Sequence, residues 1–123
     1  MTSIALVARR AALALAVSVA PFGLSVVQSQ AQTGIASVYS TREGSSRTAS
    51  GIPLRDGALT AASPNLPLGS RARVTNLKNH RSITVLITDR GPAAWTHRII
   101  DLTPAGAHAL GIDGLGQVSV VRA

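Results

Sequence analysis

The alternation of apolar and polar residues is clearest in the middle of the chain, where it predicts two strands. Residues 70–76 alternate small apolar residues with arginine and threonine, which is typical of a half-exposed strand. Residues 83–88 (ITVLIT) are largely β-branched and favour a buried strand. Residues 77–81 (LKNHR), which are polar after the leucine, separate the two runs. We therefore predict a β-hairpin over residues 71–88.

The buried strand stops sharply at residues 89–92, which read DRGP. Gly91 can adopt a positive φ, and Pro92 has no amide hydrogen to donate to a neighbouring strand. A second short apolar run, residues 98–102 (RIIDL), follows after a loop. The arrangement predicts strand, sharp turn, loop and strand.

Two carboxylates, Asp89 and Asp101, therefore lie at or near strand ends, where side chains can project into a cleft. A structural interpretation stays open for each of them. Asp89 can cap its own turn and pair with Arg90 or Arg98. Asp101 can bind the start of the following helix near Thr103, or pair with Arg98.

The rest of the chain predicts short elements. We expect a first strand over residues 33–39, a loop rich in Ser, Thr, Gly and Arg over 40–57, and a short apolar segment over 59–62. A short helix is predicted over 103–110 and a closing strand over 115–121. Five or six short strands with one short helix and no long amphipathic segment indicate a small all-β barrel.

The predicted helix has clear boundary signals. Thr103 is a suitable N-cap, Pro104 suits the first helical position, and Gly111 stands where a terminal glycine is expected. His108 lies within this helix and is expected to be packed. His80 and His97 are expected in exposed turns. No two histidines have metal-site spacing and the chain has no Cys, so we predict no metal and no cofactor.

The first 31 residues read as a signal peptide rather than as part of the domain. They contain Arg9 and Arg10 but no acid, then an apolar stretch, and small residues at Ser29 and Ala31 before the expected cleavage point. A retained membrane anchor is the alternative, but the apolar stretch is short and contains Pro21. We expect removal, which leaves one domain over residues 32–123. Without Cys the chain cannot be lipidated, and we place it in the bacterial periplasm or envelope.

The charge of this domain is one-sided. The whole chain carries +7, and loss of the two leader arginines leaves +5. A basic exported domain is attracted to anionic polymers such as the cell wall or its acidic glycans. Nucleic acid is disfavoured as a partner, because stacking aromatics and runs of basic residues are lacking. We expect a monomer without a stable membrane anchor.

Several short motifs occur in an order that resembles the rare lipoprotein A family. They cover essentially the whole predicted domain and are GIASVY (34–39), TASG (48–51), LTAA (59–62), LPLG (66–69), VTN (74–76), DRGP (89–92) and RIIDL (98–102). The resemblance implies a six-stranded double-psi β-barrel related to the barwin and expansin domains. It also implies lytic transglycosylase activity on peptidoglycan glycan strands, with a preference for strands stripped of stem peptides.

The family's functional positions carry over unevenly. The DRGP aspartate matches Asp89 and the IDL aspartate matches Asp101, but Ile52 stands where the family has Glu and Ser63 where it has His. A family Asp position is occupied by Arg here, with Asp56 adjacent. The family's aromatic after DRGP is replaced by Ala, and an aromatic side chain comes two positions later, at Trp95. The family's lipidated Cys and its C-terminal peptidoglycan-binding repeat are not found in this sequence.

The chemistry needs few groups. In lytic transglycosylation the sugar's own 6-hydroxyl attacks, so a single carboxyl group can act first as acid and then as base. We predict Asp89 in this role. The predicted substrate-binding residues are Asp101, Arg90, Ser63, Asp56 and Trp95, with Trp95 either a sugar-stacking platform or a core residue. A non-catalytic, expansin-like wall-binding domain is the alternative, because the family Glu and His are absent.

Overall fold

The computed structural model describes residues 30–44 and 46–123. The predicted signal peptide, apart from its last two residues, lies outside this described part. No helix within the described part has the length and apolarity needed to cross a bilayer.

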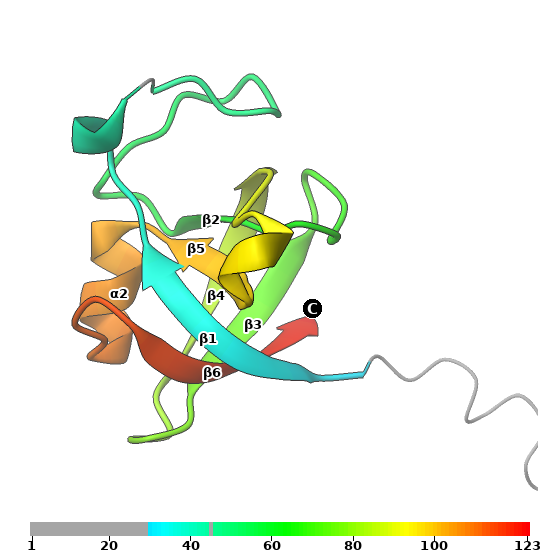
Figure 1. Cartoon of the computed structure of the whole chain (residues 1–123), viewed down its shortest axis with the longest axis vertical. Coiled ribbons are helices and arrows are strands. Elements are labelled where there is room, and N and C mark those ends of the chain that lie inside the picture. The colour runs from blue at the N-terminus through cyan, green and yellow to red at the C-terminus, as the bar shows by residue number, and fades with distance from the viewer. Residues whose placement is uncertain (1–29, 45) are drawn as a thin grey trace, which may run out of the picture.

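Six strands of the described chain close into a barrel (Figure 1). They are β1 (Gln32–Val38), β2 (Thr60–Ala62), β3 (Arg71–Asn76), β4 (Ser82–Asp89), β5 (Arg98–Leu102) and β6 (Gly116–Arg122). Around the barrel the order is β1-β5-β2-β4-β3-β6. The pairs β1–β5 and β2–β4 are parallel, and the remaining pairs are antiparallel. The predicted all-β barrel is confirmed.

The predicted hairpin is the antiparallel pair β3–β4, in which Ala72 faces Val85 and Val74 faces Ile83. On β3 the buried residues alternate with exposed ones, as the sequence pattern requires. The barrel core consists of aliphatic side chains, and its fully buried members include Val74, Val85, Ile87, Ile100, Leu102, Leu110 and Val118. Among the described residues, the core cluster is therefore aliphatic and contains no aromatic side chain.

The α-helix α2 (Pro104–Leu110) is bounded as predicted. Thr103 Oγ1 accepts the amide hydrogen of Gly106 and donates to Ala58 O at 2.6 Å. Gly111 ends the helix in the left-handed conformation. The expectation that His108 is packed is wrong. It is exposed, because the helix turns Gly106, Ala107 and Leu110 toward the barrel and residue 108 to the solvent side.

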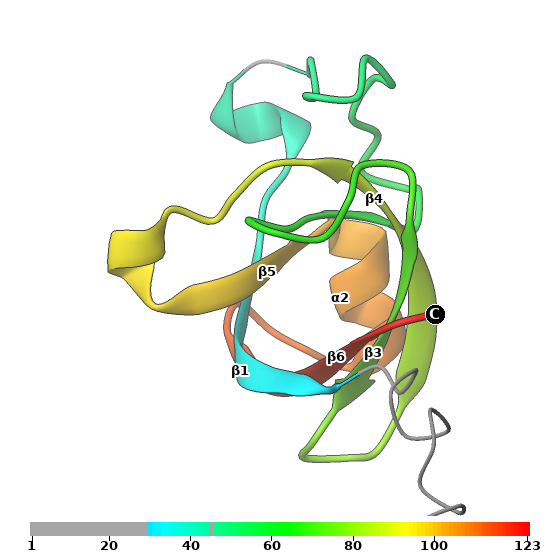
Figure 2. The same cartoon turned by 90° about the vertical axis from the view of Figure 1, so that its right-hand side faces the viewer.

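Long loops gather at one end of the barrel. The loop between β1 and β2 arches over this end and contains a 3-10 turn, η2 (Thr41–Glu43), while the β3–β4 hairpin projects from the opposite end (Figures 1 and 2). Figure 2 shows the loop between β4 and β5 protruding from the side of the barrel, with a second 3-10 turn, η3 (Ala94–Thr96). The predicted candidate residues belong to these loops and to the strand ends beside them.

Candidate functional site

The two predicted carboxylates flank a single residue of β2. In the strand registers Ala62 pairs with Asp89 of β4 on one side and with Asp101 of β5 on the other. Since Ala62 lies between the two aspartates, their Cα atoms are separated by two inter-strand spacings, or roughly 10 Å. The fold therefore brings together two residues that the sequence could only place at separate strand ends.

Asp89 is held by backbone amides. Its Oδ1 accepts hydrogen bonds from Ala49 N at 3.0 Å and from Arg90 N at 2.9 Å. It therefore caps its own turn, as one sequence alternative held. Ser50 N also donates to Thr88 O, so the β1–β2 loop is attached to the end of β4 at two adjacent residues.

The Arg90 side chain is directed to backbone carbonyls. Its Nη1 donates to Ser63 O at 2.9 Å and to Leu66 O at 2.7 Å. The guanidinium therefore braces the loop between β2 and β3. The next residue, Gly91, has φ +124°, which agrees with the positive φ expected from the sequence.

Asp101 is half-buried and lies opposite Ser37 in the parallel register of β1 and β5. Ser37 Oγ donates a hydrogen bond to Asp101 Oδ1. The other oxygen, Oδ2, faces Gly91, since a Cβ built on that glycine would lie 3.7 Å from it. The start of α2 is capped by Thr103, so the expectation that Asp101 binds the helix start is not met.

Burial raises the pKa of Asp101 above its ordinary value of 3.8. The Ser37 hydrogen bond and the positive charge of Arg98 lower this pKa, while the negative charges of Glu43 and Asp89 raise it. The net direction is upward. A carboxyl group with a raised pKa keeps its proton to higher pH, and a general acid must be protonated when the reaction begins.

Tyr39 directly follows β1 and lies within electrostatic range of the same carboxylates. Its amide donates to Leu102 O at 2.9 Å. Burial and the charges of Asp89 and Asp101 raise the pKa of Tyr39 to about 12. The Tyr39 hydroxyl lies beside the Thr88 hydroxyl, and both are buried. Neither of these two hydroxyls forms a hydrogen bond of normal geometry within the described chain. Two polar atoms beside the aspartates are therefore left without a protein partner.

Asp56 is directed elsewhere. Its carboxylate accepts from Thr41 N at 3.0 Å and Thr41 Oγ1 at 3.3 Å, at the start of η2. Glu43 ends the same turn, and its Oε2 accepts from Ser40 N. Asp56 thus holds the loop that covers the site. The negative charge of Glu43 contributes to the raised pKa of Asp101.

Ser63 lies beside Asp89, and its amide donates to Asp89 O at 3.0 Å. The side chain is 2% exposed. Its hydroxyl accepts from Asn65 N and Leu66 N and so organises the turn after β2. The Ser63 hydroxyl is therefore buried and already engaged by two backbone amides.

Trp95 is 81% exposed in η3. The alternative that it plugs the core is therefore wrong. The barrel closes without it, because aliphatic side chains fill the interior. The exposed indole remains a candidate platform for stacking on a sugar.

Four residues near the carboxylates were not predicted from the sequence: Ser37, Tyr39, Glu43 and Thr88. Ser37 and Asp101 are separated by 64 positions in the chain, and only the parallel register joins them. The GIASVY motif contains Ser37 and Tyr39, so its motif status was the one available signal. No group of three or more metal-ligating side chains is found in the described part of the chain.

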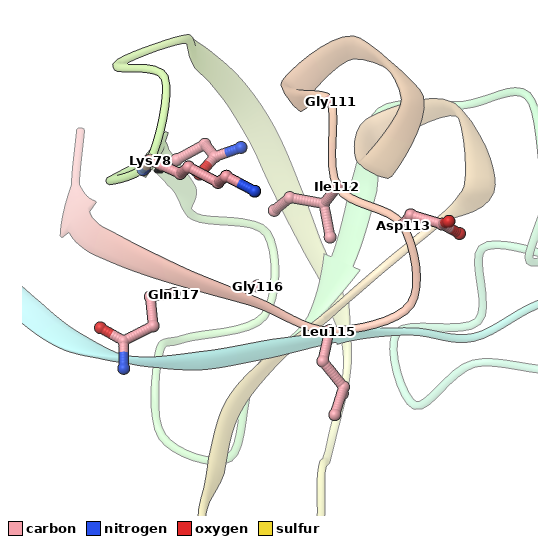
Figure 3. Close-up of a pocket in the computed structure, with 8 residues that line it drawn as sticks. Lys78, Gly111, Ile112, Asp113, Leu115, Gly116 and Gln117 are labelled. Atoms are coloured by element: carbon pink, nitrogen blue, oxygen red, sulfur yellow. Dashed lines mark hydrogen bonds between the residues drawn. The ribbon is translucent and has the colours of Figure 1, made fainter.

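A separate pocket of about 200 Å³ lies at the opposite end, between the β3–β4 hairpin and the α2–β6 connection. Lys78 and Ile112 extend toward each other there, whereas the Asp113 carboxylate points away (Figure 3). Asn76 forms part of the wall, and its side-chain amide donates to Leu110 O at 2.8 Å. This pocket does not include the predicted site residues.

The decisive comparison concerns the whole barrel. A family model described as lytic transglycolase matches residues 31–122, which include every strand described above. The chain belongs to this lytic transglycolase family. The resemblance drawn from the seven motifs, to rare lipoprotein A and its double-psi β-barrel, is confirmed.

Individual relatives in this family agree. The chain is 46% identical over 89 residues to the probable endolytic peptidoglycan transglycosylase RlpA of Synechocystis, with 71% of this chain and 27% of the relative covered. It is 45% identical over 89 residues to the endolytic peptidoglycan transglycosylase RlpA of Salmonella typhimurium, covering 72% of this chain and 23% of the relative. The corresponding Escherichia coli K12 protein is 44% identical over 89 residues, with coverages of 72% and 24%. The chain thus spans about a quarter of the length of these relatives.

Among solved structures, the Streptomyces papain inhibitor has a similar fold. The TM-score is 0.55 at 22% sequence identity, and the match covers 73% of this chain and 92% of the inhibitor. At this identity the likeness concerns the fold alone. The barrel of the lytic transglycolase family is therefore also found in a protein named for a different activity.

Proposed function

We propose that this chain is a peptidoglycan lytic transglycosylase that cleaves glycan strands, with strands stripped of stem peptides as its preferred substrate. The observation that carries the proposal is the placement of Asp89 and Asp101 on either side of Ala62, beneath the β1–β2 loop. Family membership and the names of the RlpA relatives support the same chemistry.

The reaction needs one carboxyl group to take part in two proton transfers. A protonated carboxyl group donates to the glycosidic oxygen as the bond from that oxygen to the muramic C1 breaks. The 6-hydroxyl of the same muramic residue then attacks C1, and its proton passes to the carboxylate. The products are a 1,6-anhydro end and a new free 4-hydroxyl, so no water is consumed.

We assign the proton transfers to Asp101 and electrostatic stabilisation of the developing positive charge at C1 to Asp89. Burial raises the pKa of Asp101, which suits a group that begins protonated. Asp89 receives two backbone amide hydrogens on Oδ1, an arrangement that suits an acceptor. This assignment moves the acid–base role from Asp89, where the sequence led us to expect it, to Asp101.

The other predicted binding residues have distinct proposed roles. Trp95 offers an exposed indole for stacking on a sugar ring. Arg90, Ser63 and Asp56 hold the loops around the carboxylates through the hydrogen bonds described above. We propose that these three act by positioning the loops.

The proposed setting is the bacterial periplasm. We propose export on the basis of the signal-peptide pattern of residues 1–31, and we propose no lipidated cysteine, because the sequence contains no Cys. The RlpA relatives are named for action on peptidoglycan, which lies in the envelope. We propose a monomer that requires no cofactor.

The test uses purified protein with sacculi that are intact or stripped of stem peptides by an amidase. We expect soluble 1,6-anhydro products from the stripped sacculi. Asp101→Asn should reduce their release by at least about a hundredfold, and Asp89→Asn should also reduce it. Asp113→Asn is the matched control, because Asp113 is an exposed carboxylate on the α2–β6 connection and should retain full activity.

The alternative, a non-catalytic wall-binding domain, makes a different prediction. Wild-type protein would sediment with sacculi without releasing any anhydro product, and the two asparagine variants would sediment equally well. Such a result would overturn the enzymatic proposal and keep the glycan as the target.

A further inference from the structure

Positive charge is concentrated on one part of the barrel that the proposed site does not use. Residues 71–88 and 114–123 carry five cationic side chains, Arg71, Arg73, Lys78, Arg81 and Arg122, and no carboxylate side chain. The carboxylates of the described residues belong to the β1–β2 loop, the ends of β4 and β5, and the α2–β6 connection. The strands β4, β3 and β6 are adjacent in the barrel, so this charge lies on neighbouring elements.

Arg71 and Arg73 stand on the exposed side of β3, the middle strand of the three. They are two residues apart, which separates them by roughly 7 Å along the strand. Their cross-strand neighbours are uncharged: Leu86 and Thr84 on β4, and Val121 on β6 opposite Arg73. We call this surface, formed by Arg71 and Arg73 with these three neighbours, the β3 face.

The two guanidinium groups of the β3 face are available to a ligand. Within residues 30–44 and 46–123, neither makes a hydrogen bond or ion pair with another side chain. Both residues are exposed. Guanidinium groups bind carboxylates through two parallel hydrogen bonds, so a row of free arginines suits a polymer that bears carboxylates.

The β3 face is also close to the proposed site. Arg71 pairs with Leu86, which is three residues before Asp89 on β4, or roughly 10 Å along the strand. The two residues before β3 are hydrogen-bonded to Ile87 of β4. Gly69 N donates to Ile87 O, and Ile87 N donates to Ser70 O, each at 2.8 Å. A glycan strand bound at Asp89 and Asp101 therefore needs to extend only a short distance to reach Arg71 on β3.

We propose that the β3 face is a second glycan-binding surface, which holds an acidic glycan strand through the carboxylates of its muramic residues. A stem peptide is joined to that carboxyl group by an amide bond, so the muramic carboxylate is charged only on a stripped strand. The identity of the polymer rests on the proposed function. The binding itself does not require cleavage, and its test can therefore fail or succeed independently.

The experiment compares two double variants that lose the same charge. Arg71→Gln with Arg73→Gln removes the arginines of the β3 face. Lys78→Gln with Arg81→Gln removes two exposed cations at the tip of the β3–β4 hairpin, at the end of the barrel away from the carboxylates. Both are tested for sedimentation with amidase-stripped sacculi, with the same sacculi after carbodiimide amidation of their carboxylates, and with chitin. Equal thermal melting midpoints for both variants establish that the fold is intact.

We expect the half-saturating protein concentration on stripped sacculi to rise about fivefold for the β3-face variant and to change little for the control. On amidated sacculi and chitin the two variants should bind alike. The proposal is overturned if the two variants lose the same affinity on stripped sacculi. It is also overturned if the β3-face variant loses as much on amidated sacculi, or if duplex DNA competes more strongly than the stripped glycan at matched charge.

Cleavage is measured in the same samples to separate the two proposals. Weakened binding by the β3-face variant, in the absence of any anhydro product from wild type, would reject the catalytic proposal and keep this one. Normal cleavage with unchanged binding would reject this proposal and keep the catalytic one.

Discussion

Ser37 and Asp101 face each other across the parallel register of β1 and β5, and the Ser37 hydroxyl donates to Asp101 Oδ1. This hydrogen bond favours the charged carboxylate and opposes the effect of burial. The protonation of the proposed catalytic acid is therefore set by a balance between burial, one hydroxyl group and the nearby charges.

Ser37→Ala should raise the pKa of Asp101 further, because the hydrogen bond to its charged form is lost. The measurement is an NMR titration of the side-chain carboxyl carbon. In the activity assay, the loss of rate at higher pH should move to higher pH as well. Ser119→Ala on β6 serves as the control and should leave the titration unchanged. A downward shift in the Ser37 variant would contradict the assignment.

Asp101→Asn should stabilise the folded protein near neutral pH. Because the folded pKa of Asp101 lies above its unfolded value, the carboxyl's contribution to stability is fully present below the unfolded pKa and is lost as pH rises through the folded pKa. The amide does not titrate. The difference in melting temperature between variant and wild type should therefore be small below about pH 3 and larger at pH 7. Equal melting curves for the two proteins at both pH values would contradict the direction of the shift.

Tyr39→Phe tests the buried hydroxyl that has no partner in the described chain. Removing a buried unsatisfied polar group should leave stability unchanged or raise it by about 1 kcal/mol. The pKa of Tyr39 is raised to about 12, so wild type should lose stability between pH 10 and 12, and the variant should lose less. Urea denaturation across this range measures both effects. If the hydroxyl contacts substrate, the same variant should also lose activity.

Ile52→Glu should increase activity. Ile52 is 46% exposed, so a charged side chain is tolerated there, and it stands where the family has Glu. The Ile52 carbonyl accepts a hydrogen bond from Thr48 Oγ1. Ala49, which follows Thr48, donates its amide hydrogen to Asp89 Oδ1. The new carboxylate would therefore lie on the loop that binds Asp89. We expect about a tenfold gain in anhydro-product release from Ile52→Glu. We expect no gain from Ile52→Gln, in which the side chain has the shape of glutamate but no charge. Equal rates in both variants would show that the position is not used.

Much of the fold could be predicted from local patterns. Alternating residues on β3 and β-branched residues on β4 determined a hairpin, and Thr103, Pro104 and Gly111 set the ends of α2. These signals are local, because periodicity and capping depend on residues a few positions apart. The failure at His108 has the same origin: a helix of seven residues is too short for its sequence alone to define which side is buried.

The site was accessible only in part. The motifs identified Asp89 and Asp101, since each stands at the end of an apolar run. They did not reveal that Ala62 separates the two, that Ser37 is bound to Asp101, or that both charges act on Tyr39. Each of these contacts joins strands that are far apart in the chain.

The sequence by itself determined the strand-forming segments, the helix boundaries and the family. The tertiary structure alone decided which strand ends meet, how deeply Asp101 is buried, and that Arg71 and Arg73 lie on a surface free of acids. The physical reason is that backbone preference and amphipathic pattern act over a few residues. Desolvation and charge–charge energies depend on distances between segments that only barrel closure brings together.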